Sequence, residues 1–241
     1  MSMTESMNNK PTKRIAAIDM GTNSFHAIIM DIYPDGSYRR MDKLKEMVLL
    51  AEEGMNNMLS EEAMDRGIKA LEKIKYLCEN LEVEEILAYA TSAIREAENG
   101  GDFIQRSIDE LGIKPRAISG SREANLIGQA IQHAVALDDR PVLMVDIGGG
   151  SVEFIIGNKM ELFFNASYKI GAARMATSVQ QNDPATKKDI KALIKTFERE
   201  LQELKKQLTN HSVDTIVGSS GTMENIAAMI ADRKSMSTSL S

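Results

Sequence analysis

The sequence has little cysteine, no tryptophan and no long hydrophobic run. A single cysteine, Cys78, in 241 residues excludes a disulfide framework and a cysteine-based zinc cluster. No apolar stretch approaches the roughly 18 residues that are needed to cross a bilayer. The first dozen residues also lack the apolar segment of a secretion signal. We therefore expect a cytoplasmic protein that has no membrane association.

Positive charge is also scarce relative to negative charge. The chain has 29 lysines and arginines against 35 aspartates and glutamates, a formal net charge of −6. No block of basic residues stands out, so we do not expect DNA as a partner. An acidic protein can still bind phosphate groups, but it must do so through backbone N–H groups, a metal ion or a few placed arginines.

The pattern of apolar residues and turn signals predicts a mixed α/β protein. The first half is predicted to hold five strands, at residues 13–20, 24–33, 37–48, 85–90 and 116–119. The second half is predicted to hold four strands, at residues 141–147, 152–157, 161–169 and 214–218. Helices are expected at residues 60–80, 103–111, 121–136, 187–208 and 223–231.

The two halves contain an internal repeat. When residues 18–29 are set over residues 145–156, an aspartate, a glycine, a serine and an Ile-Ile pair coincide. Each copy is a strand that ends in aspartate, a turn containing glycine, and a second strand, which indicates two homologous domains. Two such domains facing one another would place the two turns across a cleft. We place the domains at residues 13–138 and 139–232, the second being incomplete, with a disordered tail at 1–12 and a polar tail at 233–241.

Both repeated turns suit phosphate chemically. Glycine lets the backbone approach an anion and leaves N–H groups pointing at it. The neighbouring carboxylates, Asp19 and Asp146, would repel a polyphosphate unless a divalent cation lay between them. The segment Gly218–Thr222 precedes a predicted helix and adds a third anion site. Each turn alone reads more simply as a structural turn, but the three together favour phosphate binding.

Five motifs resemble those of one known family. They are Asp19-Met-Gly-Thr-Asn-Ser-Phe-His26, Ala90-Thr-Ser-Ala-Ile-Arg-Glu-Ala97, Ile118-Ser-Gly-Ser-Arg-Glu-Ala124, Asp146-Ile-Gly-Gly-Gly-Ser-Val-Glu153 and Gly218-Ser-Ser-Gly-Thr222. At these residues the chain resembles the exopolyphosphatase/guanosine pentaphosphate phosphatase (Ppx/GppA) family of the actin-like superfamily. The resemblance implies two actin-like (ribonuclease H-like) α/β domains related by duplication, an active-site cleft between them, and a second domain that is truncated.

The resemblance also implies roles for individual residues. Glu123 matches the general base that activates the attacking water, and Asp146 and Arg95 complete the expected catalytic set. Asp146, Glu153 and Asp19 are the expected ligands of Mg²⁺ or Mn²⁺. Arg174 follows a family pattern to which we attach no role. The expected phosphate-binding residues are Gly21, Thr22, Asn23, Ser24, Gly148, Gly149, Gly150, Ser151, Ser219, Ser220, Gly221 and Thr222.

The sequence leaves several functions open. The main prediction is a metal-dependent hydrolase that releases terminal orthophosphate from inorganic polyphosphate. A rival with the same chemistry converts guanosine pentaphosphate (pppGpp) to ppGpp. Other classes are an actin-like ATPase or kinase and a non-catalytic, truncated sensor. The second half lacks a predicted fifth strand, and an exposed sheet edge of this kind favours self-association, so we expect a homodimer.

Overall fold

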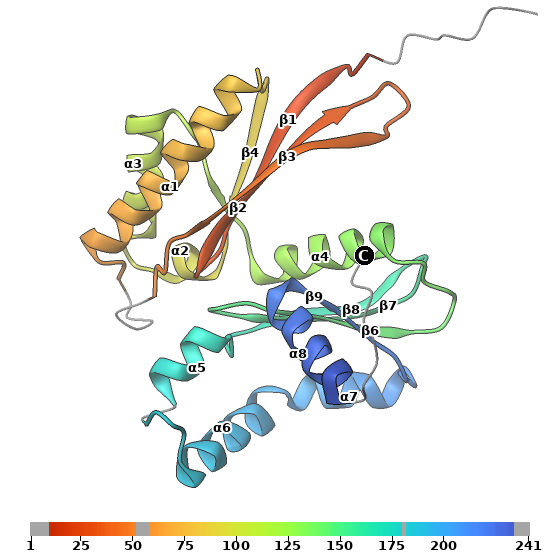
Figure 1. The fold of residues 1–241 in the computed structure, drawn as a ribbon. Coiled ribbons are helices and arrows are strands. Elements are labelled where there is room, and N and C mark those ends of the chain that lie inside the picture. Colours follow the sequence, from red (N-terminus) through yellow and green to blue (C-terminus); the bar gives the residue numbers. More distant parts are fainter. Residues whose placement is uncertain (1–9, 52–57, 180–181, 234–241) are drawn as a thin grey trace, which may run out of the picture. The chain divides into compact units, whose positions relative to one another are not determined.

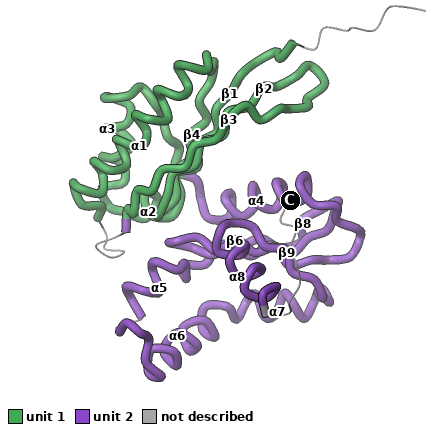
Figure 2. Tube along the Cα trace, viewed as in Figure 1, with its two compact units in different colours: residues 1–50, 57–117 green, residues 51–56, 118–241 purple. Residues whose placement is uncertain are grey.

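A computed structural model describes residues 10–51, 58–179 and 182–233 of the chain (Figure 1). The described residues fall into two compact units (Figure 2). Unit 1 comprises the described residues up to Leu50 together with 58–117, and unit 2 comprises Ala51 and the described residues from Ile118 onward. The division after Ala117 lies earlier than the boundary expected near residue 138.

The helix α4 (Gly120–Ala134) explains this difference in the boundary. It packs on strands β7 and β8 of unit 2. Gly128 permits the close approach, because a Cβ atom there would lie 2.8 Å from Leu162 Cδ1 and 3.1 Å from Ile155 Cγ2. The helix begins at Ser119, whose side chain accepts a hydrogen bond from the Arg122 N–H, rather than at the expected Ser121.

Unit 1 is built on a five-stranded sheet in the order β3-β2-β1-β4-β5. The antiparallel strands β1, β2 and β3 are joined by β4 and β5, which run parallel to β1. The strands are β1 (Lys13–Met20), β2 (Ser24–Ile32), β3 (Tyr38–Met47), β4 (Glu85–Ala90) and the two-residue β5 (Arg116–Ala117). The five expected strands are therefore present, although the last is shorter than predicted.

Helices α1 (Glu61–Asn80) and α3 (Gly100–Leu111) cover one face of this sheet (Figure 1). Alternate strand residues such as Ile18 and Phe25 are buried against them, as the alternation predicts. Gly67 of α1 faces Phe103 of α3, and a Cβ atom there would lie 2.7 Å from the Phe103 ring. Ser60 caps α1 by accepting a hydrogen bond from the Ala63 N–H, as expected from the sequence.

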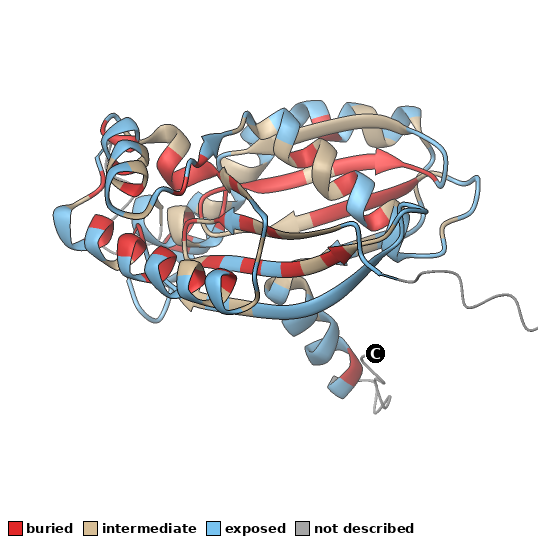
Figure 3. Ribbon diagram, turned by 90° about the horizontal axis from the view of Figure 1, so that it is seen from above, coloured by how far each residue is buried: buried red, intermediate tan, exposed pale blue. Residues whose placement is uncertain are grey.

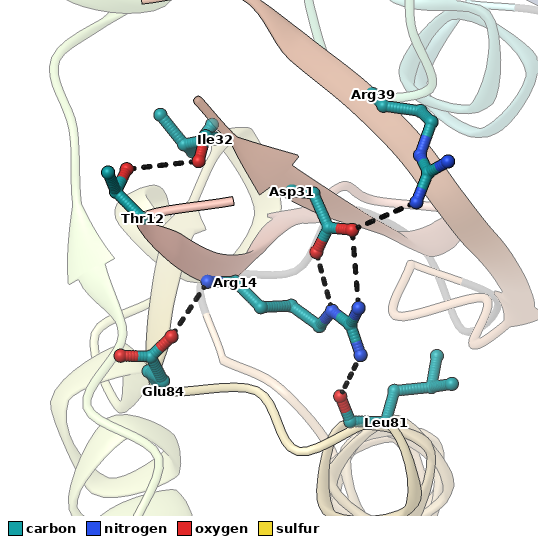
Figure 4. Close-up of polar contacts among 7 residues, drawn as sticks. All are labelled: Thr12, Arg14, Asp31, Ile32, Arg39, Leu81 and Glu84. Atoms are coloured by element: carbon teal, nitrogen blue, oxygen red, sulfur yellow. Dashed lines mark hydrogen bonds and ion pairs between the residues drawn. The ribbon is translucent and has the colours of Figure 1, made fainter. Parts of the chain in front are cut away.

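A buried ion pair links strands β1 and β2 at the end of the unit 1 sheet that lies opposite the turn at residues 21–24 (Figure 4). Asp31 of β2, whose side chain is 1% exposed, accepts hydrogen bonds from Arg14 of β1 at 2.6 and 3.2 Å. Arg14 also donates to the Leu81 carbonyl after α1, and Arg39 of β3 lies 3.4 Å from Asp31. The Arg14 hydrogen bond holds the pKa of Asp31 below its ordinary value. No motif of the sequence predicted this network.

Unit 2 repeats the plan of unit 1 with a four-stranded sheet in the order β8-β7-β6-β9. Its strands are β6 (Val142–Ile147), β7 (Val152–Gly157), β8 (Leu162–Tyr168) and β9 (Ile216–Ser219). The order matches that of β3-β2-β1-β4, and within the described residues of unit 2 no strand corresponds to β5. The expected α/β fold of two duplicated domains, with four strands in the second, is confirmed.

Different helices cover the two faces of the unit 2 sheet. Helix α4 lies on the face that carries Met144 and Ile155. The opposite face, with Val145 and Ile156, packs against side chains from the helices that follow β8. These helices are α5 (Ala172–Ser178), α6 (Lys187–Glu200), α7 (Gln202–Asn210) and α8 (Ser220–Arg233). Figure 3 shows the buried residues along the strands and on one side of the helices.

The structure departs from the expected helices in three places. The single helix expected at 187–208 is two helices, because the chain breaks at Leu201 between α6 and α7. Helices α2 (Ser92–Glu96) and α5 were not predicted, since both are too short to show an apolar period. The expected tails at 1–12 and 233–241 lie mostly outside the described residues. Thr12, however, is fixed by hydrogen bonds to the Ile32 carbonyl.

Candidate active site

A row of four polar residues crosses the whole sheet of unit 2. In the strand register, Asp146 of β6 lies opposite Glu153 of β7 and beside Ser219 of β9. Glu153 in turn lies opposite Ser167 of β8. We call Ser219, Asp146, Glu153 and Ser167 the polar row. Residues paired in register share one face of a sheet, so the four side chains project to the same side.

The polar row lies on the sheet face that α4 covers. Asp146 is two residues beyond Met144 on β6, and Glu153 is two residues before Ile155 on β7. Both hydrophobic residues pack against Ala124 of α4, and period-two alternation places the acids on the same face. Glu123 immediately precedes Ala124 in the first turn of α4. Three predicted site acids are thus gathered at one end of unit 2.

The row is held by hydrogen bonds at both ends. The Ser219 hydroxyl donates to Asp146 Oδ2 at 2.6 Å, and the Ser167 hydroxyl donates to Glu153 Oε1 at 2.7 Å. Each serine therefore restrains one carboxylate. Ser219 is also a predicted phosphate-binding residue, and in the structure its hydroxyl contacts Asp146. Ser167 was not foreseen, because its partner is set by the register of β8 on β7.

Glu153 is almost completely buried, with 2% of its surface exposed. Burial raises its pKa from 4.5 to about 7, and the negative charges of Glu123 and Asp146 act in the same direction. Hydrogen bonds from Ser167 and Ser151 oppose the rise in the pKa. No lysine or arginine in the described part of the chain forms an ion pair with Glu153. A buried acid that titrates near neutrality is typical of functional sites.

The glycine turn after β6 presents backbone N–H groups. Within the turn, the Gly148 N–H donates to the Ser151 carbonyl at 3.0 Å. The carbonyls of Gly148 and Gly149 accept hydrogen bonds from the N–H groups of Ala172 and Arg174. The N–H groups of Gly149 and Gly150 donate to no acceptor among the described residues. Free N–H groups beside engaged carbonyls make the turn a suitable anion site.

The first turn of α5 holds this glycine turn in place. A Cβ atom at Gly171 would lie 2.5 Å from backbone atoms of Gly149 and Gly150, so only glycine fits there. The Arg174 side chain donates through Nε to the Gly150 carbonyl at 2.9 Å. Arg174, to which the sequence assigned no role, therefore contacts the backbone of the glycine turn.

The third expected phosphate segment lies at the same edge of the sheet. Strands β6 and β9 are parallel, so their carboxyl ends meet there. Ser220 begins α8 in the left-handed region, with φ 73°, and its hydroxyl donates to the Ile147 carbonyl at 3.3 Å. Gly221 and Thr222 follow in the first turn of α8. Unit 2 therefore brings the glycine turn, the acids and a helix start together.

The repeated turn of unit 1 has the same backbone structure. The Gly21 N–H donates to the Ser24 carbonyl at 3.1 Å. Carbonyls of Thr22 and Asn23 accept hydrogen bonds from residues 48–50, which follow β3. Asp19 lies opposite His26 in the register. The remaining predicted residue of unit 1, Arg95, lies in the last turn of α2, with its guanidinium 3.7 Å from the carboxylate of the neighbouring Glu96.

The acids do not form a complete metal cage. Across residues 10–51, 58–179 and 182–233, no three His, Cys, Asp or Glu side chains are placed together to hold a metal ion. Mg²⁺ in phosphate sites is held by one or two carboxylates together with phosphate oxygens and water. The adjacent carboxylates of Asp146 and Glu153 fit that smaller requirement.

No helix in the described part of the chain is long and apolar enough to span a membrane.

The two sheets with matching strand order and turns define the duplicated actin-like class of α/β protein. Within this class, the chain belongs to the Ppx/GppA phosphatase family, which matches residues 29–241.

Solved structures agree with this assignment. An exopolyphosphatase from Cytophaga hutchinsonii is 36% identical and superposes with a TM-score of 0.88, over 95% of this chain and 73% of that chain. A Ppx/GppA family member from Aquifex aeolicus is 29% identical with a TM-score of 0.71, over 91% of this chain and 70% of that chain.

Curated relatives are longer proteins. A guanosine-5'-triphosphate,3'-diphosphate pyrophosphatase from Aliivibrio fischeri is 35% identical over 211 residues. The similarity covers 87% of this chain but 42% of that relative. A protein of the same name from Photobacterium profundum is 35% identical over 212 residues, with the same coverage. The chain thus spans less than half the length of these two curated relatives.

Proposed function

We propose that the chain is a metal-dependent phosphoanhydride hydrolase that releases terminal orthophosphate from inorganic polyphosphate. The observation that carries this proposal is the placement of Glu123, Asp146 and Glu153 beside a glycine turn with two free N–H groups. Hydrolysis of a terminal phosphoanhydride requires an oriented water, a base, and positive groups around the phosphoryl oxygens. Unit 2 supplies the base and the N–H donors from its own residues.

Each group has a distinct task in this proposal. Glu123 accepts the proton of the attacking water, which is worth about 10²–10⁴ in rate for a positioned base. The N–H groups of Gly149 and Gly150 donate to phosphoryl oxygens, whose charge grows during the reaction. Asp146 and Glu153 hold Mg²⁺ or Mn²⁺, and the metal neutralises phosphate charge when it is bound. In unit 1, Asp19, the turn at residues 21–24 and Arg95 are proposed to bind phosphate groups or a metal ion.

The second candidate is hydrolysis of pppGpp to ppGpp. Both polyphosphate and pppGpp end in a phosphoanhydride, so the same base and turn serve either substrate. The names of the relatives support both candidates. Two relatives are named guanosine-5'-triphosphate,3'-diphosphate pyrophosphatase, and one is named an exopolyphosphatase. Phosphate release from each substrate, measured side by side over a range of concentrations, decides between them. Release of ADP from ATP that depends on an acceptor would instead indicate a kinase.

Replacement of Glu123 by glutamine tests the catalytic proposal. We expect E123Q to lower phosphate release by about 10²–10⁴-fold, because glutamine cannot take a proton. The melting temperature should stay close to that of the wild type. Glu203 is a matched control, since it is a first-turn glutamate of another helix of unit 2, and E203Q should keep full activity. Turnover of E123Q near the wild-type value would contradict the proposal.

Two further expectations remain predictions. A homodimer is predicted from the sheet edge at β9, and sedimentation at several concentrations tests it. A cytoplasmic location is also proposed, and fractionation of cells that express the tagged chain tests it.

A further inference from the structure

We propose that Ser167 is a positioning residue that holds the Glu153 carboxylate in its working orientation. This inference rests on the proposed function, because it assigns Ser167 to the same reaction. It adds a residue on a strand, β8, that none of the sequence motifs includes.

The contact between the two residues is direct and enclosed. Ser167 lies opposite Glu153 in the register of β8 on β7, and its hydroxyl donates to Glu153 Oε1 at 2.7 Å. Glu153 is 2% exposed, so bulk water cannot readily replace this donor. The hydrogen bond engages one of the two carboxylate oxygens, Oε1. The rotation of the carboxylate is thereby limited.

The charges around Glu153 make this donor important. Glu123 and Asp146 both act on Glu153 through negative charge, and no cation of the described residues pairs with it. Two serine hydroxyls, those of Ser167 and Ser151, donate hydrogen bonds to the Glu153 carboxylate. Ser151 belongs to the turn that is proposed to bind phosphate. Ser167 is therefore the donor that stays with Glu153 whether or not phosphate is bound.

The repeat in unit 1 shows that the sheet does not require this hydroxyl. The residue that corresponds to Glu153 is His26, and it lies opposite Lys45 of β3. Strand β3, which takes the place of β8 in the sheet of unit 1, thus carries a lysine where β8 carries Ser167. The hydroxyl occurs in the half that has the pair of acids, which argues for a role connected with those acids.

Two variants of Ser167 separate positioning from packing. We expect S167A to lower kcat by about 10–100-fold and to change KM by less than about threefold. A loss of about 10–100-fold is typical when a side chain that hydrogen-bonds to a metal ligand is removed. S167T keeps the hydroxyl and should restore kcat to within about threefold of the wild type. The matched control is S107A, which removes a fully buried hydroxyl that donates to the Ile113 carbonyl in unit 1. It should lower the melting temperature and leave kcat unchanged.

Crystal structures of the wild type, S167A and S167T supply a readout that does not depend on turnover. The Glu153 carboxylate should rotate away from its wild-type position in S167A and keep that position in S167T. An unmoved carboxylate in S167A, or a wild-type kcat for S167A, overturns the inference. If the wild type releases no phosphate from either substrate while the carboxylate still moves in S167A, the proposed function fails and the positioning contact stands.

Discussion

The two units share a backbone plan but differ in the residues beside the repeated turn. In both, the first glycine N–H of the turn donates to the carbonyl of the closing serine, at 3.1 Å in unit 1 and 3.0 Å in unit 2. In unit 2 the residue opposite the aspartate before the turn is the buried Glu153, whereas in unit 1 it is the exposed His26. His26 lies 2.8 Å from the Ser24 hydroxyl, so a polar contact is kept although the charge is lost.

This difference teaches that the turn and the catalytic groups are separable. In the proposed function the turn can serve in both units, because phosphate binding depends on backbone N–H groups that a turn with glycine can present. In the proposed function a single base is sufficient, and a second buried carboxylate at the position of His26 would add a desolvation cost. In unit 1 the buried carboxylate of Asp31 is instead paired with Arg14, and this ion pair joins strands β1 and β2.

Among the variants that test this comparison of the two units, the largest effect should come from breaking the turn of unit 2. G171A places a methyl group 2.5 Å from the backbone of Gly149 and Gly150, so the turn must move. Loss of aligned donors typically costs about 10²–10³ in rate, and we expect phosphate release to fall by that amount. G101A is the control, since a Cβ atom there meets nothing within 4 Å. Full activity of G171A would separate the turn from catalysis.

Breaking the buried pair of unit 1 should affect stability alone. D31N leaves Arg14 without its carboxylate, and we expect a loss of about 3 kcal/mol in the free energy of unfolding. Urea unfolding measures this loss, and kcat below the unfolding transition should be unchanged. D42N, at an exposed position on β3, provides the comparison and should unfold like the wild type. An equal loss in both variants would show that the Arg14 contact is not responsible.

Glu153 should make the stability of unit 2 depend on pH. Its folded-state pKa of about 7 exceeds the ordinary 4.5, so folding favours the protonated form. Stability from this group is complete below pH 4.5 and is lost as the pH rises through 7. In a chelating buffer, E153Q should therefore be more stable than the wild type at pH 8, on the order of 2 kcal/mol, and nearly equal to it at pH 5. A gain of the same size at both pH values would contradict this origin.

The smallest effect should come from a surface ion pair of unit 1. Lys13 and Glu85 join β1 and β4, but their side chains are 44% and 45% exposed. Exposed pairs contribute little to stability, so K13A should lower the free energy of unfolding far less than D31N does. High salt should reduce the difference between K13A and the wild type further. A loss as large as that of D31N would remove the distinction between exposed and buried pairs.

The repeat made much of the fold predictable. The nine expected strands are all present, because alternating apolar residues bounded by glycine and aspartate are local signals. The break at Leu201 and the short helices α2 and α5 were not predicted, because tertiary contacts rather than an apolar period decide them. The boundary after Ala117 was also missed, since it depends on which sheet α4 packs against.

By itself, the sequence determined the two aspartate–glycine turns, their duplication and the acids Glu123, Asp146 and Glu153 as candidates. Only the tertiary structure decided what each candidate contacts. Strand register placed Ser167 on Glu153 and Ser219 on Asp146, and a shift of one residue would have turned those side chains to the other face. Burial then raised the pKa of Glu153 to about 7, because desolvation depends on what covers a carboxylate and not on its neighbours in the chain.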